Sequence, residues 1–465
     1  MVLNHLFDRF VAQTPVSVMV RGTIEFALQP QQLNDLFERH AQHQYTRDLL
    51  FSSVVELVSL VVAGTHSSVY AAYQKSPHEI AVSLTSVYNK LNGLEPPISA
   101  ELVRFSARQL EPVLQQLGGA LPALIPGYRT QILDGNHLAA TEHRLAETRA
   151  QSAAPLPGQS LVVLDPALQL ITDIFPCEDG HTQERALLGA VLPTVRERDL
   201  WIADRNFCVH DFLVGIHARK GCFIIREHKG LAWEAAGKLR SRGRIAGARV
   251  REQPITIRTG DGVTIRLRRV VLELDTPTRD GETELALISN LPATAARAAF
   301  IGIIYRQRWT IETAFQELTV ALRCEIKTLC YPRAALFAFC VAVVAYNVQA
   351  VVKGALRAVH GAKKITAEVS NYHLADEIAG MNRGLMVALP AAEWQDFRAI
   401  PVPDLVALLR RLAEQVTLSR FRKARRGPKK LAARRTYDPA HPHVATAKLL
   451  ASRPKKKKPA NSSIN

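Results

Sequence analysis

The chain has 465 residues, 47% of them hydrophobic, and a net charge of +17. This length allows two to four domains, and this composition allows sizeable hydrophobic cores, as in a large soluble protein. The six cysteines form no C-x-x-C pair, which argues against a disulfide framework and a zinc ribbon. No signal-peptide pattern opens the chain, and its longest apolar run, 334–346, is shorter than the ~20 residues of a membrane span. We therefore expect a cytoplasmic protein without a membrane partner.

The positive charge is concentrated in two blocks. Residues 419–465 hold 15 basic residues and one acid, and residues 219–269 hold 14 basic residues and four acids. The rest of the chain is mildly acidic. Two basic blocks on an acidic body indicate two surfaces that bind phosphates. For Lys455 to Lys458 alone, a solvated tail is an equal interpretation.

The first 125 residues predict a helical domain. Apolar residues recur at spacings of three and four between 33 and 61, which is typical of helices packed on a core. This domain has 8 basic and 10 acidic residues, so its charge gives no support for phosphate contacts.

Residues 126–218 predict the first part of an α/β sheet. Short apolar strands are expected at 130–133, 161–164, 169–175 and 200–203, and helices at 184–196 and 209–219. The first of these strands ends at Asp134 and the fourth at Asp204. Side chains at the carboxyl ends of such strands meet at the open edge of a sheet.

The second half of the chain changes from a strand-rich segment to helical segments. Residues 219–291 predict a β insertion domain that carries the middle basic block. Residues 292–360 predict helices, the first of them running from 294 through 323, and 334–346 is expected to be buried. Residues 361–465 predict further helices and then, from about 419, a basic and mobile tail.

One helix carries the main chemical signal. At about 100° per residue, Tyr305, Arg308 and Glu312 fall within a sector of roughly 60° beside an apolar stripe. A partly desolvated carboxylate with an arginine one turn away is suited to a metal site, while Arg308 and Tyr305 remain free to reach a phosphate. The competing interpretation is an ordinary surface pair spaced i, i+4.

Three carboxylates together make a more specific site. Asp134, Asp204 and Glu312 can hold two hard divalent cations, which activate a nucleophile and stabilise a leaving oxygen in phosphoryl transfer. Mg²⁺ is the expected ion, and Mn²⁺ is expected to substitute for it. Among other acids, Asp165 is expected to cap its own Asp-Pro turn. Asp173 is expected inside a strand, and Asp179 and Asp199 are expected in loops.

Four motifs in order resemble the bacterial insertion-sequence transposases with a DDE triad. The run 305–312 resembles their Y-x2-R-x3-E signature, and 203–207 resembles their A-D-R-x-F motif. Leu133-Asp134-Gly135 is similar to their first aspartate motif, and 287–292 to the strand end that precedes their glutamate helix. Together the matches cover about 130 to 350. The family's lysine seven residues after the glutamate is Thr319 here, so its phosphate contact is either missing or supplied by Lys327 or Arg323.

The resemblance implies a fold and an activity. The fold would be an RNase H-like core (126–218 and 292–360) interrupted by the β insertion, after a helical domain that binds transposon ends. The activity would be cleavage at terminal inverted repeats and strand transfer into target DNA, with Asp134, Asp204 and Glu312 as catalytic metal ligands. A homodimer would assemble on two ends, at the nucleoid when bound to DNA. Candidate DNA-binding residues are Tyr305, Arg308, Arg205, Trp233, Arg240, Arg242, Arg244 and Lys327.

Two candidate contacts rest on further arguments. Trp233 is a candidate for holding a flipped base, although a lone tryptophan more often packs in a core. Arg240, Arg242 and Arg244 occupy every second position, so a regular strand would present all three on one face.

Two other functions stay open for the whole protein. One is an RNase H-like nuclease without strand transfer, and the other is an inactive DNA-binding relic, which Thr319 motivates.

Overall fold

A single sheet of ten strands runs through the part of the chain that the computed structural model describes, residues 5–46, 48–75, 80–260, 262–278, 280–424 and 443–453. Its order is β3-β2-β1-β4-β5-β10-β9-β8-β6, with β7 paired to β8. The strands are β1 (Arg129–His137), β2 (Gln159–Asp165), β3 (Leu170–Cys177), β4 (Asp199–Ala203), β5 (Cys222–Arg226), β6 (Glu234–Ala235), β7 (Arg240–Ile245), β8 (Ala248–Arg258), β9 (Thr264–Leu274) and β10 (Glu284–Ser289).

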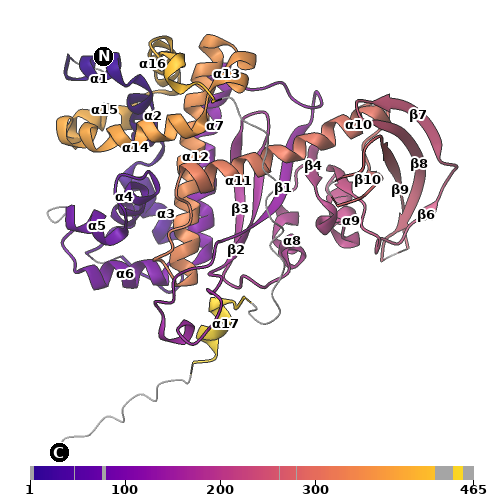
Figure 1. Cartoon of the computed structure of the whole chain (residues 1–465), viewed down its shortest axis with the longest axis horizontal. Helices are drawn as coiled ribbons and strands as arrows, with labels where there is room; N and C mark the ends of the chain where they lie inside the picture. The colour runs from indigo at the N-terminus through magenta and orange to yellow at the C-terminus, as the bar shows by residue number, and fades with distance from the viewer. Residues whose placement is uncertain are drawn as a thin grey trace, which may run out of the picture.

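Helices cover the sheet and form most of the remaining body (Figure 1). The α-helices are α1 (His5–Gln13), α2 (Pro15–Ala27), α3 (Pro30–His40), α4 (Phe51–Val62), α5 (Val69–Lys75), α6 (Leu84–Gly93), α7 (Pro96–Leu117), α8 (Leu188–Val191), α9 (His210–Ala218), α10 (Ala298–Tyr305), α11 (Trp309–Ala321), α12 (Pro332–His360), α13 (Ala362–Glu368), α14 (Asn371–Ala388), α15 (Gln395–Ala399), α16 (Val402–Glu414) and α17 (Thr446–Ala451).

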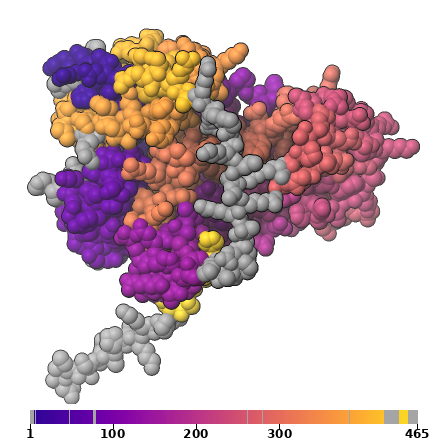
Figure 2. All heavy atoms as spheres, viewed as in Figure 1, coloured from indigo at the N-terminus to yellow at the C-terminus, as the bar shows by residue number. Residues whose placement is uncertain are grey.

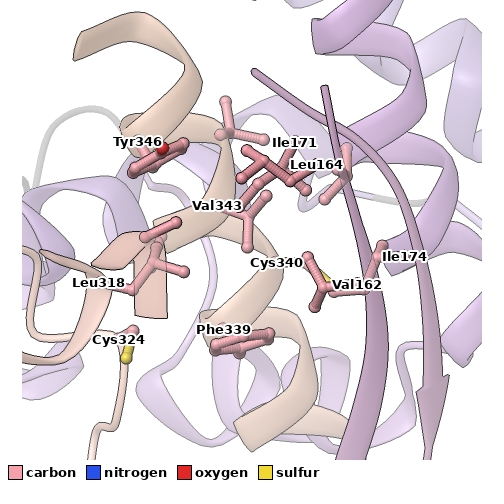
Figure 3. Packing of buried hydrophobic residues seen from close by; sticks show 14 of the residues in the cluster. Val162, Leu164, Ile171, Ile174, Leu318, Cys324, Phe339, Cys340, Val343 and Tyr346 are labelled. Carbon is pink, nitrogen blue, oxygen red and sulfur yellow. The ribbon is translucent and has the colours of Figure 1, made fainter. Parts of the chain in front are cut away.

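Helix α12 is the central helix of the fold. It is long and apolar enough to cross a membrane, yet 94% of its most apolar window is buried inside the protein. It packs on α7, α16, α4 and β3, and Figure 3 shows Cys340 of this helix beside the strand residues Val162 and Ile174. The expectation of a buried helix around 334–346 therefore agrees with the structure, and the helix extends well beyond the apolar run.

Alternation along the strands divides the core into two layers. On β1, Ile132 belongs to the cluster shared with α12, whereas Leu133 belongs to the cluster that includes α9. The same division holds for Ile202 and Ala203 on β4. This period of two is what a sheet covered on both faces requires.

The β-rich segment extends the central sheet. β5 pairs in parallel with β4, and β10 joins β5 to β9, so that hydrogen bonding is continuous from β3 to β6. Figures 1 and 2 show this end of the sheet as a lobe that projects from the helical body. The segment expected as a separate insertion domain is therefore a continuation of the same sheet.

The glutamate helix differs from its expected form. The predicted helix 294–323 is divided into α10 and α11 by one 3₁₀ turn, Arg306–Arg308. α10 packs against β7, β8 and β9, and α11 continues to α12 and α14, along a nearly straight path (Figure 1). The two helices thus connect the β-rich lobe to the helical body.

The C-terminal region is only partly described. Residues 443–453 dock beside the loop that joins β1 to β2, where Leu156 N donates to Val444 O at 2.8 Å and α17 contacts residues 146–148. Arg453 forms an ion pair with Glu147. The expected mobile tail falls mainly on 425–442 and 454–465, which lie outside the described residues.

Candidate active site

The first two acids of the motif lie side by side on neighbouring parallel strands. β1 and β4 run in register up to Leu133 opposite Ala203, and the next residues are Asp134 and Asp204. Adjacent strands lie about 4.8 Å apart, so the two backbones present their carboxylates at the same place. β1 does not end at residue 133 as expected, because it continues to His137 through antiparallel pairing with β2.

Local backbone groups fix both aspartates. Gly135 N donates to Asp134 Oδ1 at 3.0 Å, and Asn206 N donates to Asp204 Oδ1 at 2.7 Å. Asp204 also caps the short 3₁₀ turn Arg205–Phe207. Each carboxylate keeps its second oxygen for another partner.

Arg308 connects the strand end to the glutamate helix. Its Nη1 donates to Asp134 Oδ2 at 2.8 Å and its Nη2 donates to Glu312 Oε1 at 2.6 Å. The Arg308 side chain is only 13% exposed, so this is not the surface pair that the spacing alone allowed. Arg308 therefore holds two of the three predicted acids in one charge-assisted cluster.

The electrostatics of the cluster show that negative charge is crowded there. Burial raises the pKa of Asp134 to about 7, Arg308 opposes that rise, and the charges of Asp204 and Glu184 add to it. Burial opposes the charge of Arg308, but Asp134, Tyr305 and Glu312 outweigh it and raise its pKa. A site with this balance favours additional positive charge.

The donor set fits hard divalent cations, since all three acids offer carboxylate oxygens. Within the described ranges, no group of three or more His, Cys, Asp or Glu side chains is arranged to hold a metal ion. The Arg308 guanidinium occupies one oxygen of Asp134 and one of Glu312. Asp134, Asp204 and Glu312 would hold the ions once Arg308 releases those oxygens.

Tyr305 is not an exposed phosphate contact. Its side chain is buried, and burial raises its pKa to about 12. It forms a hydrogen bond with Arg308. Tyr305 therefore supports the arginine from inside the fold.

Arg205 is placed beside a cavity at the edge of the cluster. The cavity has a volume of about 500 Å³, and its lining includes the basic residues Arg205, Arg226, Lys229 and Arg269, together with His228 and the acids Glu227, Glu282 and Glu284. Glu282 pairs with both Arg226 and Arg205, and these contacts lower its pKa, Arg226 most strongly. The cavity thus offers guanidinium groups that are already partly neutralised.

Trp233 is held by its neighbours. Its Nε1 donates to Glu227 Oε1 at 2.8 Å, and the guanidinium carbon of Arg269 lies 5.3 Å from the ring centroid. The ring is half-buried and packs against the α9 side of the core. These contacts agree with a tryptophan that packs against the core, and base stacking by Trp233 remains a prediction.

The prediction that Arg240, Arg242 and Arg244 share one face is wrong. Pairing slips by one residue between Ser241 and Arg244, where Gly243 adopts a φ of +93°. An extra residue in a strand reverses the side to which later residues point.

These arginines are also largely compensated. Arg242 pairs with Glu252 at 2.7 Å and Arg244 with Asp275 at 2.6 Å. The middle basic block is therefore less positive at its surface than its count of residues implies.

The remaining predicted residues lie around this centre. Lys327 is exposed, and Thr319 is exposed with its Oγ1 donating to Phe315 O. Asp165 accepts hydrogen bonds from Ala167 N and Leu168 N, so it caps its turn as expected. Asp199 was expected in a loop but begins β4, where it pairs with Arg129.

Comparison with protein families matches this chain to a transposase domain. Residues 126–348 match the transposase DDE domain. The matched segment contains Asp134, Asp204 and Glu312 with the elements that carry them, and the match supports a DDE transposase. A comparison with curated proteins finds no match to this chain.

Among solved structures, the chain is similar to piggyBac transposase in a synaptic complex with hairpin DNA. The two are 12% identical, the similarity covers 83% of this chain and 84% of that one, and the TM-score is 0.38. A similarity at this level does not define the fold or the site.

Proposed function

We propose that this protein is a cut-and-paste transposase of the insertion-sequence branch with the Y-x2-R-x3-E signature. The observation that carries the proposal is the pair of hydrogen bonds from Arg308 to Asp134 on β1 and to Glu312 on α11, beside the parallel strand β4 that Asp204 follows. Its position within the segment that matches the DDE domain supports the same function.

The chemistry follows from the residues of the cluster. Two Mg²⁺ ions held by Asp134, Asp204 and Glu312 would activate water or a 3′ hydroxyl and stabilise the leaving oxygen. The strand pair β1–β4 orients the two aspartates, while Arg308 keeps Glu312 turned toward them. When Arg308 releases the carboxylates, its guanidinium is placed to bind a DNA phosphate in two-point contact.

DNA is the proposed partner, as terminal inverted repeats and as target. Arg205 and Arg226, at the lining of the neighbouring cavity, are placed to receive backbone phosphates once Glu282 gives up its ion pairs. A homodimer that brings two ends together would complete the assembly. We place this complex in the bacterial cytoplasm, on the nucleoid.

The test is a cleavage and joining assay with a labelled transposon end, target DNA and Mg²⁺. Wild type should cleave the end and join it to target DNA. Glu312→Gln should abolish cleavage while end binding stays intact, because the amide keeps the shape of the side chain but not the charge of a metal ligand. Equal cleavage by Glu312→Gln and wild type rejects the role of Glu312, and cleavage without joining favours a nuclease.

Thr319 motivates one alternative, an inactive DNA-binding relic. Its hydroxyl is bonded to the helix backbone, so it supplies no cation where the family has lysine. A wild-type protein that binds ends but does not cleave them would support this alternative.

A further inference from the structure

A fourth carboxylate stands at the candidate site and belongs to none of the motifs. Glu184 begins the short 3₁₀ turn Glu184–Leu187, which packs against the turn Arg205–Phe207. Its side chain is 19% exposed, whereas its neighbours Gln183 and Arg185 are exposed. A surface hollow of about 460 Å³ lined by His137, Glu184 and Asn206, among others, opens at this point.

Glu184 first contacts the backbone beside Asp134. A Cβ atom placed on Gly135 would lie 1.9 Å from Glu184 Oε1, so the carboxylate occupies the space that glycine leaves. Gly135 is the residue whose N–H holds Asp134 Oδ1. The absence of a side chain at 135 thus allows Glu184 to pack directly on the group that orients the first aspartate.

Glu184 also contacts the residue that orients the second aspartate. Asn206 Nδ2 donates to Glu184 Oε2 at 2.5 Å, and Asn206 N donates to Asp204 Oδ1 at 2.7 Å. Arg185 Nη2 donates to Asn206 Oδ1 at 3.1 Å, which fixes the orientation of the amide. The turn beginning at Glu184 therefore holds Asn206 from both ends of its side chain.

We propose that Glu184 is a positioning residue that joins the two backbone donors of the site, Gly135 and Asn206, and so sets the separation of Asp134 and Asp204. The inference rests on the proposed function, because that separation matters for cations shared by the two aspartates. Neighbours of metal ligands act in this way by fixing the orientation of the ligands.

Two variants distinguish the shape of the Glu184 side chain from its charge. Glu184→Ala removes the acceptor of Asn206 Nδ2, whereas Glu184→Gln keeps an oxygen in the same place and removes only the charge. If Glu184 positions the site, the glutamine variant should resemble wild type. If Glu184 binds a cation directly, both variants should fail.

The experiment is Mn²⁺ binding to the full chain by isothermal titration calorimetry, with end cleavage measured against Mn²⁺ concentration. Glu184→Ala should weaken Mn²⁺ binding about tenfold, the lower end of the effect of outer-shell partners. Glu184→Gln should stay within about threefold of wild type. Glu197→Ala, which removes an exposed acid paired with Lys220, is the matched control and should change nothing.

A second variant keeps the test valid if Glu184→Ala folds poorly. Gly135→Ala should displace the Glu184 carboxylate and weaken Mn²⁺ binding similarly, whereas Gly189→Ala, where an added Cβ meets nothing within 4 Å, should leave it unchanged. Wild-type Mn²⁺ affinity in Glu184→Ala, or equal losses in Glu184→Ala and Glu184→Gln, overturns the positioning role alone. A wild-type protein that neither binds Mn²⁺ nor cleaves DNA overturns the proposed function and this inference with it.

Discussion

Arg308 is the residue on which the geometry of the candidate site depends most. Its two nitrogens bond carboxylates from a strand and from a helix, and lysine cannot reproduce this fork. In the proposed reaction this fork moves to a DNA phosphate, and losing one charge-assisted hydrogen bond there costs about 1.5–3 kcal/mol, so Arg308→Lys should slow end cleavage by about 10- to 100-fold. Single-turnover cleavage at saturating DNA measures this. An unchanged rate would show that the Arg308 fork binds no phosphate in the reaction.

Asp134 makes a prediction about stability and pH in the absence of metal ions. Its pKa rises from an ordinary value of 3.8 to about 7, so between these values the folded protein holds a proton that the unfolded chain has released. The free energy of unfolding should therefore decrease as pH rises through this window.

Asp134→Asn removes this penalty. With EDTA present, the variant should be more stable than wild type at pH 8, and the advantage should shrink toward pH 5. Urea unfolding at the two pH values measures the difference. Equal stability at pH 8 would contradict the raised pKa.

At the residue scale, the sequence marks the acids that stand in motifs and does not mark an acid that only folding brings near them. Asp134, Asp204 and Glu312 follow from strand ends and spacing along a helix. Glu184 carries no comparable signal, since it begins a segment expected simply to be helical. The prediction that Arg240 and Arg244 share one face of a strand was wrong, because the backbone at Gly243 breaks the alternation of side chains between the two faces.

At the scale of elements, α11 is anchored by a buried ion pair. Lys353 Nζ on α12 donates to Glu317 Oε2 at 3.0 Å, and Asn371 on α14 also donates to Glu317. Glu317 lies little more than one turn after Glu312, so the pair fixes the helix that carries the candidate ligand.

Lys353→Ala should leave Glu317 buried without its cation. The expected loss is about 3 kcal/mol in the free energy of unfolding, and the double variant with Glu317→Gln should recover part of it. Chemical denaturation measures both. A loss below about 1 kcal/mol would show that the pair behaves as an exposed one.

The elements themselves were predictable where the apolar period was clear. The helical first 125 residues, the strands that carry the aspartates and the buried helix all agree with the structure in kind. The 3₁₀ turn at 306–308 was not predictable, because α10 packs on the lobe and α11 on the helical body. The spacing of apolar residues along the chain does not show that the two halves of a helix pack on different parts of the protein.

At the scale of the whole molecule, one sheet connects the candidate site to a lobe at its far end. The alternation of the sequence predicts the β content of this lobe but not its continuity with the core, which is made by the parallel pairing of β5 with β4. The pairing of β10 with β5 then carries the sheet on to β9.

The basic end of the chain provides a prediction at this scale. Residues 454–465 include four lysines, and each phosphate neutralised contributes about 0.9 to the slope of log K against log salt. Deleting them should lower that slope by up to about 3.6 for nonspecific DNA, as measured by fluorescence anisotropy from 50 to 200 mM salt. An unchanged slope would show that these lysines do not contact DNA.

The central claim is that Asp134, Asp204 and Glu312 share divalent cations. Anomalous diffraction from crystals grown with Mn²⁺ and transposon-end DNA tests it most directly. We predict anomalous peaks bounded by these three carboxylates, with Arg308 turned away from at least one of them. A well-ordered complex whose Mn²⁺ peaks lie elsewhere, or whose Arg308 still bridges Asp134 and Glu312, would contradict the account.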